Sequence, residues 1–356
     1  MNERFVLISG YGSETAPGVR LARFNPVSGA LTLVDELAGI ANPSFVIAHP
    51  TQPWFYVVAE TGIASQDKPG GVWAGRYDKA GTAGMRLNAL NQQPSGGDWP
   101  CHLALDPAGR WLFVSNYGSG NMSVLPILND GALGPRSAHV QHQGSGVNAE
   151  RQEGPHAHST TLTPDGAYAV VADLGIDSLV VYGFDPLTGH LAAREPARGR
   201  PGAGPRHMTF HPSGRSAYVA NELDCTVSVF DYADGRFSER QVEPTVPVGV
   251  TGSSVADIHL SADGARLYVS TRGHNSLAVF GVDLDGSLSP RGIVPCGGDW
   301  PRNFAVSPDG AFVLVANQYS GDIAVLPVLA SAPWLGAPVA RLDMPQAACI
   351  TFLPER

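Results

Sequence analysis

A short phrase recurs along this chain and constrains its fold more than any other feature. Each copy joins a strand of alternating character to a Pro-x-Gly turn and then to a second strand, and residues 204–215 and 300–311 show the strand and turn clearly. A unit of this kind cannot bury its own apolar faces, so it has to stack against further copies. The turn proline, replaced once by alanine, recurs at Pro50, Pro107, Pro164, Pro212, Ala262, Pro308 and Pro354.

The spacing of these turns predicts a β-propeller. The seven anchors lie about 46 to 57 residues apart, which is within the period of propeller blades. A third strand and a more variable fourth follow the second, as in residues 226–230 and 237–240. Four antiparallel strands in each of seven units describe an all-β, seven-bladed propeller. We expect residues 1–356 to form this single domain.

The two ends of the chain are expected to complete one blade between them. Pro354 lies two residues from the end of the sequence, so its unit has a first strand at about residues 347–353 and no others. Suitable partners are found at the beginning of the chain, in residues 5–8, 18–22 and 31–33. Pairing of the C-terminal strand with these N-terminal strands would close the ring and remove its exposed edges.

Composition narrows the functional classes. Hydrophobic residues make up 43% of the chain, enough for a core, and no apolar run has the length of a membrane span. The net charge of -9 and the lack of a basic run argue against nucleic-acid binding. Residues 1–10 lack the cationic start and long apolar stretch of a signal peptide, so we expect a cytoplasmic protein. A closed ring without free edges is expected to be a monomer.

The sequence gives little support for metal or cofactor chemistry. His156 and His158 would lie on one side of a strand, but no clear third ligand accompanies them. There is no Gly-x-Ser-x-Gly elbow, no P-loop and no dinucleotide fingerprint. We therefore expect neither a metal nor another cofactor. No Cys-x-x-Cys pair occurs, and we expect free, mostly buried thiols at Cys101, Cys225, Cys296 and Cys349.

The repeat also shows which side chains share a position in space. The first strand of each unit begins six residues before the anchor, and the second ends about ten residues after it. These two positions lie at the same end of an antiparallel hairpin. The earlier position holds Ser44, Cys101, His158, Arg206, Ala256, Arg302 and Ala348. The later position holds Tyr11, Glu60, Tyr117, Leu174, Glu222, Arg272 and Gln318.

These rim positions differ from unit to unit and collect charge, whereas interior strand positions stay small or aliphatic. If the first strands line the central channel, an acidic protein gathers arginines and a histidine at one mouth. Such a mouth predicts a small anionic substrate, although solvated ion pairs on a polar rim are an alternative. From the rim we take Arg302, Tyr117 and Gln318 as substrate-binding candidates, and we add His156, which shares a strand face with His158.

Several stretches resemble the lactonase family of seven-bladed propellers, which includes bacterial 6-phosphogluconolactonases and fungal carboxymuconate cycloisomerases. The resemblance extends over essentially the whole chain and is most specific in residues 150–159, 204–207, 219–223 and 270–272. It implies an active site of one histidine, one glutamate and two arginines. These fall on residues that the register had already placed at the mouth, namely His158, Glu222, Arg206 and Arg272.

Hydrolysis of a sugar lactone is the leading hypothesis, with 6-phosphogluconolactone of the pentose phosphate pathway as the expected substrate. A histidine suits the activation of water because its ordinary pKa lies near working pH. Arginines suit an oxyanion and a substrate phosphate or carboxylate. We assign water activation to His158 and anion binding to Arg206 and Arg272, with Arg302 as a phosphate contact. Glu222 would orient these groups or serve as an alternative base.

Two other readings stay open at this point. A cycloisomerase that closes a carboxymuconate to its lactone would use the same arginines and a proton-transferring group. A non-catalytic interaction platform is also compatible with the fold, because fold alone does not fix function. The irregular stretch of residues 134–155 leads directly into His156, and we expect it to fold over the mouth. Trp99 and Trp300, in two copies of Gly-Gly-Asp-Trp-Pro, are expected to be packing anchors.

Overall fold

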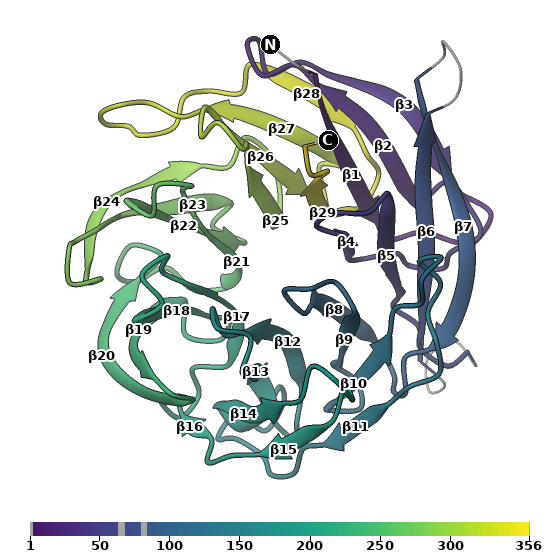
Figure 1. The fold of residues 1–356 in the computed structure, drawn as a ribbon. Helices are drawn as coiled ribbons and strands as arrows, with labels where there is room; N and C mark the ends of the chain where they lie inside the picture. Colours follow the sequence, from purple (N-terminus) through teal and green to yellow (C-terminus); the bar gives the residue numbers. More distant parts are fainter. Residues whose placement is uncertain (1–2, 63–67, 80–83, 356) are drawn as a thin grey trace.

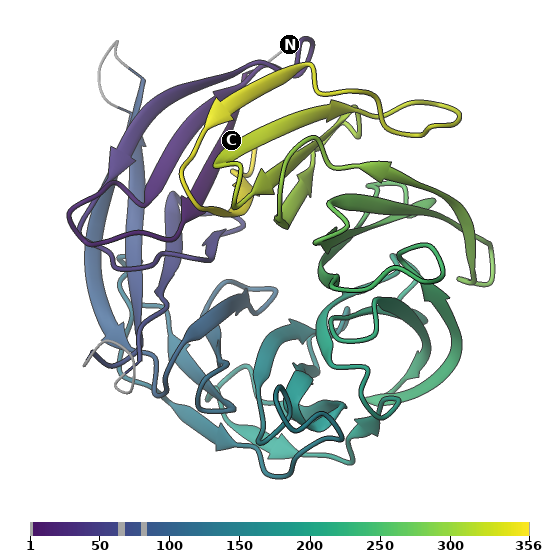
Figure 2. The ribbon, with the colours of Figure 1, turned by 180° about the vertical axis from the view of Figure 1, so that it is seen from behind.

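Seven antiparallel sheets form a ring around a central channel in the computed structural model, which describes residues 3–62, 68–79 and 84–355 (Figures 1 and 2). We number these sheets as blades 1 to 7 from the N-terminus. The seven-bladed propeller expected from the repeat is therefore confirmed. Within the described residues, no helix has both the length and the apolar character needed to cross a membrane.

Blade 1 is built from both ends of the chain, as the position of the last anchor predicted. Its order is β29-β1-β2-β3, and the C-terminal strand pairs antiparallel with β1 from Val6 opposite Phe352 to Gly10 opposite Ala347. Figure 1 shows yellow β29 lying directly beside purple β1. The strands of this blade are β29 (Ala347–Phe352), β1 (Arg4–Gly10), β2 (Val19–Phe24) and β3 (Leu31–Leu37).

The next blades follow the chain from the channel outward. Blade 2 consists of β4 (Val46–Ala48), β5 (Trp54–Ala59), β6 (Gly71–Lys79) and β7 (Met85–Pro94). Blade 3 consists of β8 (Pro100–Leu105), β9 (Trp111–Asn116), β10 (Asn121–Pro126) and β11 (Ala138–Gln141). Blade 4 consists of β12 (Ala157–Leu162), β13 (Tyr168–Asp173), the short 3-10 helix η1 (Leu174–Ile176), β14 (Ser178–Phe184), β15 (Leu191–Ala193) and β16 (Ala197–Arg198).

The remaining blades repeat the same order. Blade 5 consists of β17 (Pro205–Phe210), β18 (Ser216–Asn221), β19 (Thr226–Ala233) and β20 (Arg236–Pro244). Blade 6 consists of β21 (Ser254–Leu260), β22 (Arg266–Arg272), β23 (Ser276–Val282) and β24 (Leu288–Pro295). Blade 7 consists of β25 (Pro301–Val306), β26 (Phe312–Asn317), β27 (Asp322–Pro327) and β28 (Ala340–Asp343).

Two details differ from the simple repeat. In blade 4 the fourth strand is split, because β15 and β16 both pair with β14. In blade 3 the fourth strand is β11, which lies inside the stretch of residues 134–155 that we had expected to be irregular. The expectation was wrong for this part of the stretch, because its backbone groups form hydrogen bonds with the outer edge of β10.

The apolar core is divided among the interfaces between blades. Each neighbouring pair of blades shares one layer of buried side chains, and the described residues form seven such layers. Between blades 7 and 1, for example, Phe24 packs edge-on against Phe312 with ring centroids 5.8 Å apart. Burial of one large apolar side chain contributes about 1.5–3 kcal/mol, and this contribution is realised only where two blades meet.

The innermost strands contain an irregularity that recurs around the ring. In β8, β12, β17, β21, β25 and β29 the pairing with the next strand shifts by a bulge near the start of the strand. The unpaired residue in β12 is His158, in β17 it is Arg206, and in β25 it is Arg302. A bulge re-aims side chains next to a site. The position that we had identified as the rim is thus also the position where the ladder is interrupted.

Candidate active site at the channel mouth

Glu222 organises one side of the mouth. It follows directly on β18, and its two carboxylate oxygens bind three guanidinium groups. Its Oε2 accepts from Arg206 Nε at 2.9 Å and lies 2.9 Å from Arg272 Nη2, while its Oε1 accepts from Arg151 Nη2 at 2.7 Å. Burial raises the pKa of Glu222, but the three arginines outweigh that effect and hold the pKa well below its usual range. Glu222 is therefore an ionised anchor for arginines and a poor base.

The two buried arginines are fixed by backbone as well as by Glu222. Arg206 donates to the carbonyl of Ala256, and Arg272 donates to the carbonyl of Val255 at 2.9 Å. Burial lowers the pKa of Arg206 to about 10, with the neighbouring Arg272 acting in the same direction, so the guanidinium stays charged at neutral pH. The Nε of Arg272 is buried and has no hydrogen-bond partner among the described residues. The pair presents fixed donors whose orientation does not depend on a ligand.

His158 is a neutral imidazole at the centre of this arrangement. It is buried, with 5% of its surface exposed. Burial lowers its pKa well below the usual value, and Arg206 and His207 add to the effect. Its Nδ1 lies 3.9 Å from Cys101 Sγ, and its ring meets those of Tyr117 and His207 edge-on. Within the described chain no carboxylate binds this imidazole, so nothing offsets the burial that keeps it in its neutral form.

His156 and Tyr117 form a support beside His158. Their rings stack with centroids 4.4 Å apart and an interplanar angle of 13°. The Nδ1 of His156 pairs with the carbonyl of Tyr117 at 3.0 Å, and its Nε2 lies 3.2 Å from Glu153. Both ring nitrogens of His156 are thus occupied. The arrangement makes His156 a positioning residue for Tyr117 and leaves the open imidazole to His158.

Arg151 is a residue of the mouth that the repeat did not reveal. It lies in the stretch before β12, which has no copy elsewhere in the chain and hence no register. Besides Glu222 it contacts the Tyr117 hydroxyl at 3.3 Å. Its side chain is 41% exposed, so it borders the opening. The C-terminal part of residues 134–155 therefore reaches the mouth as expected, although β11 does not.

Arg302 and Gln318 occupy other parts of the rim. Arg302 lies over the ring of Tyr11 at 5.1 Å from its centroid. Gln318 donates to the side chain of Gln346 at 3.2 Å, at an exposed position. Of the eight predicted site residues, Arg206 and Arg272 bind Glu222 directly. His158 and Tyr117 lie next to this group, whereas Gln318 contacts Gln346 instead. Leu174, which shares the rim register, is fully buried in η1 and offers no polar group.

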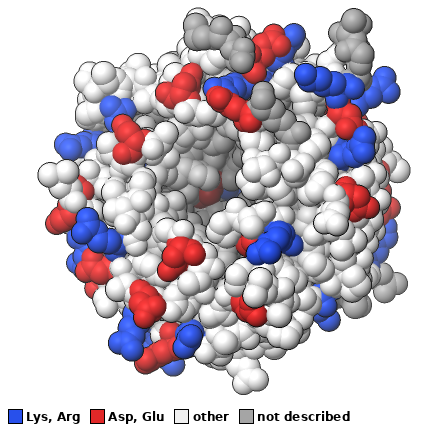
Figure 3. All heavy atoms as spheres, in the orientation of Figure 1, with Lys and Arg blue, Asp and Glu red and all other residues white. Residues whose placement is uncertain are grey.

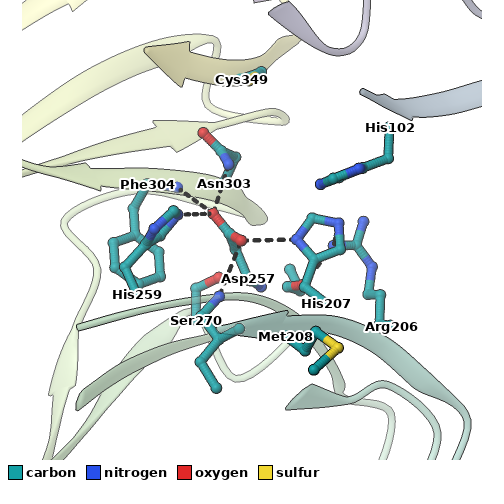
Figure 4. Close-up of polar contacts among 12 residues, drawn as sticks. His102, Arg206, His207, Met208, Asp257, His259, Ser270, Asn303, Phe304 and Cys349 are labelled. Carbon is teal, nitrogen blue, oxygen red and sulfur yellow. Dashed lines mark hydrogen bonds and ion pairs between the residues drawn. The ribbon is translucent and has the colours of Figure 1, made fainter. Parts of the chain in front are cut away.

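Beneath the mouth, the inner strands carry a second polar cluster around Asp257 (Figure 4). Asp257 accepts from His207 Nδ1 at 2.8 Å and His259 Nε2 at 2.8 Å, and it also accepts from the Asn303 side chain. The other nitrogen of His207 accepts from Arg206 Nη1 at 3.2 Å. The cluster thus links Arg206 at the mouth to the channel, and it fixes the tautomer of His207.

Consecutive residues share a cavity at this depth because of the bulges. Its lining includes the pairs Arg206 with His207 in β17 and Arg302 with Asn303 in β25. On a regular strand the two members of each pair would face opposite sides. The space-filling view shows the ring hollowed at its centre, with charged atoms in its depth (Figure 3).

The loops around the mouth carry the two tryptophans of the repeated Gly-Gly-Asp-Trp-Pro phrase. Trp300 stacks on Tyr319 with centroids 4.7 Å apart, and the guanidinium of Arg272 lies 5.6 Å from its ring centroid. Trp300 therefore helps to pack Arg272, in line with its predicted role as an anchor. All four cysteines are free and buried, as expected. The described residues include no group of three or more metal-ligating side chains suited to a metal ion.

Comparison with known proteins identifies the family. Residues 5–352 match the model of the family described as lactonase, 7-bladed beta-propeller. The chain belongs to this lactonase family. It is 35% identical over 352 residues to the 6-phosphogluconolactonase of Bacillus subtilis (strain 168), with 98% of each chain covered. It is 32% identical over 314 residues to a 6-phosphogluconolactonase of Formosa agariphila, covering 86% of this chain and 87% of that one.

A solved structure gives the same assignment. The periplasmic gluconolactonase of Pseudomonas aeruginosa superposes with a TM-score of 0.92 at 33% identity, covering 99% of both chains. The resemblance noted in the sequence is thus confirmed over essentially the whole chain. The protein is an enzyme of the lactonase type, a carboxylic ester hydrolase.

Proposed function

We propose that the protein hydrolyses a sugar lactone that carries an anionic group, with 6-phosphogluconolactone as the best candidate, at the mouth formed by His158, Arg206, Glu222 and Arg272. The observation that carries this proposal is the set of three arginines held on Glu222 beside a neutral imidazole that no described carboxylate binds. The names of the relatives support the lactone, and two of them support the 6-phosphate.

The charge balance of the mouth favours an anion. Four arginines face two carboxyl groups there, so positive charge remains when every ion pair is counted. The protein as a whole has a net charge of -9, which makes this local excess stand out from the rest of the surface. Guanidinium groups bind phosphate and carboxylate oxygens through parallel hydrogen bonds. Arg151, whose side chain is 41% exposed, and Arg302, which lines the cavity, are the candidates for the substrate's anionic group.

Hydrolysis then follows from the remaining groups. His158 accepts a proton from water as its oxygen attacks the lactone carbonyl carbon. Arg206 and Arg272 stabilise the negative charge that develops on the carbonyl oxygen, and they are already oriented for it. The bond from the carbonyl carbon to the ring oxygen breaks, and the ring oxygen leaves as an alkoxide that takes up a proton. General base catalysis of this kind contributes roughly 10²- to 10⁴-fold.

A substrate panel tests the proposal. Purified protein is incubated with gluconolactone, with its 6-phosphate, with other sugar lactones and with carboxymuconate, while proton release and ultraviolet absorbance are followed. We expect turnover of sugar lactones and a clear preference for the 6-phosphate. Turnover of carboxymuconate alone would assign the site to a cycloisomerase. No turnover of any substrate would favour an interaction platform.

A variant links the activity to the mouth. His158→Ala should lower kcat on the preferred lactone by about 100-fold or more, because water then lacks its base. His211→Ala is a matched control, since its Nδ1 pairs with the backbone amide and the hydroxyl of Ser213 in a surface turn. Full activity of His158→Ala would show that another group activates water.

A further inference from the structure

A second carboxyl group lies across the mouth from Glu222 and plays no part in the mechanism above. Glu60 follows directly on β5 in blade 2 and occupies the same register position as Glu222 in blade 5. In a ring of seven blades these two are nearly opposite. Backbone pairing of the Glu60 amide with the carbonyl of Asn42 at 3.1 Å fixes its place at the rim.

The two oxygens of Glu60 have different surroundings. Oε2 accepts from the Tyr11 hydroxyl at 2.9 Å and also from the Ser44 hydroxyl. In the described part of the chain, Oε1 makes no hydrogen bond. A carbonyl-like oxygen can accept two hydrogen bonds while its partner oxygen carries a proton. The geometry therefore holds one oxygen in place and leaves Oε1 to bear the proton and offer it.

The electrostatic surroundings of Glu60 and Glu222 also differ. Three guanidinium groups bind Glu222 directly, whereas no described arginine or lysine forms an ion pair with Glu60. The charged and titratable groups facing Glu60 are Arg302, Arg206, Tyr11 and Cys101. Burial raises the pKa of Glu60, and the hydrogen bonds from Ser44 and Tyr11 and the nearby Arg302 oppose this without reversing it. Two carboxyl groups whose environments push their pKa values apart divide the roles of acid and anion between them.

We propose that Glu60 is the general acid of lactone opening and donates the proton on Oε1 to the leaving ring oxygen. This inference rests on the proposed lactonase function. As the bond from the carbonyl carbon to the ring oxygen breaks, the ring oxygen takes the Glu60 proton and becomes the product hydroxyl. The proton that His158 removed from water passes back to Glu60 through solvent. The new carboxylic acid then ionises, so one proton is released in each turnover.

The chemistry of the leaving group provides the decisive test. A sugar lactone releases an alkoxide, which needs a proton, whereas the aryl lactone dihydrocoumarin releases a phenoxide, which does not. Glu60→Gln should lower kcat on the sugar lactone by about 100-fold or more with KM within about twofold. On dihydrocoumarin the loss should stay below about threefold. Glu60→Asp should restore part of the activity, and Glu195→Gln, at an exposed surface position, should behave as wild type.

The pH profile gives a second readout that does not depend on the aryl lactone. A general acid works in its protonated form, so wild-type kcat/KM for the sugar lactone should fall as pH rises through the raised pKa of Glu60. Glu60→Gln should lose this alkaline fall while keeping a low residual rate. Thermal unfolding of the variant within a few degrees of wild type would show that its fold is intact.

The outcomes separate the two proposals. Equal losses on both lactones, an unchanged alkaline fall, or full activity of Glu60→Gln would each overturn the role of Glu60 while leaving the lactonase function standing. A wild-type protein that hydrolyses no lactone would overturn the proposed function itself. Selective loss on the sugar lactone together with disappearance of the alkaline fall would establish Glu60 as the acid.

Discussion

The side chain of Arg151 shows how a single residue at the opening can bind substrate without joining the chemistry. It shares Glu222 with Arg206 and Arg272, but unlike them it is 41% exposed, and in the described part of the chain it donates to no backbone carbonyl of the channel. Its guanidinium can therefore turn toward a ligand anion while the other two keep Glu222 ionised. Contacts of this type strengthen binding equally in the ground state and the transition state.

We expect Arg151→Ala to raise KM for a phosphorylated lactone about 10-fold or more, with kcat within about threefold. The physical reason is the loss of one charge-assisted contact to the phosphate. Steady-state kinetics on gluconolactone with and without the 6-phosphate provides the measurement, and the effect should be confined to the phosphorylated substrate. Arg110→Ala is the control, because Arg110 lies in the turn between β8 and β9, at the end of blade 3 that is away from the mouth. A fall in kcat on both substrates would instead assign Arg151 to the reaction itself.

At the scale of the element, the closing strand β29 decides whether the ring exists. Ala347, Ala348, Cys349 and Ile350 are all buried, and the strand pairs with β1 while it also contacts β4 of blade 2 and β25 of blade 7. Without it, the edge of β1 would be open and available for pairing with other chains.

Removal of residues 347–356 should therefore abolish the cooperative unfolding transition and cause aggregation. Circular dichroism melting and size-exclusion chromatography would measure both effects. Removal of residues 355–356 alone is the matched control, because in the described part of the chain it takes away the ion pair between Arg4 and the exposed Glu355, and surface pairs contribute about 0–1 kcal/mol. A folded, monomeric product of the longer truncation would show that the ring does not depend on this closure.

The inner strands also show what the sequence could and could not predict. Because the repeat is regular, it located the blades, the closure and the rim positions of His158, Arg206, Glu222 and Arg272. It did not predict the bulges, because two-residue alternation assigns Arg206 and His207 to opposite faces, whereas both line one cavity.

The Asp257 cluster escaped prediction for the same reason. Asp257 lies one residue after the rim position in β21, where the ladder skips from Val255 to Ile258. A regular strand would direct its side chain away from the rim residues. Arg151 was missed for a different reason, since a segment without copies has no register. The site therefore combines rim residues that the repeat positions with side chains that the bulges redirect.

On the scale of the whole molecule, the channel concentrates histidines that stay neutral. Burial is the largest cause that lowers the pKa of His102 and His158 well below the usual value, and it lowers the pKa of His207 to about 4. These histidines come from β8, β12 and β17. The ring centroid of His207 lies 5.2 Å from that of His102 and 5.3 Å from that of His158. The closed ring holds them together in one channel, where protonating one disfavours protonating the next.

This arrangement predicts how stability depends on pH. Each of these histidines binds a proton in the unfolded chain below about pH 6.5 but not in the fold, so unfolding takes up protons and the free energy of unfolding falls as pH falls. The contribution is up to about 1.4 kcal/mol per pH unit for each histidine. Glu60, with its raised pKa, acts in the opposite direction with at most one proton. The raised pKa of His259 acts above pH 6.5, because below that value it is protonated in both states.

Among the described residues, the lowered pKa values of the three channel histidines and of His139 outweigh the raised pKa values of Glu60 and Asp224. The slope is therefore net positive between pH 5 and pH 6.5, a window above the ordinary pKa of most carboxyl groups. Denaturant unfolding at half-unit steps of pH would measure this slope. His102→Gln should lower this slope by the equivalent of about one proton, which is up to about 1.4 kcal/mol per pH unit. The substitution removes one titrating ring, while the catalytic groups stay in place. A flat or negative slope would show that the imidazoles of the channel carry protons in the folded state, and with it the neutral His158 required for water activation would be lost.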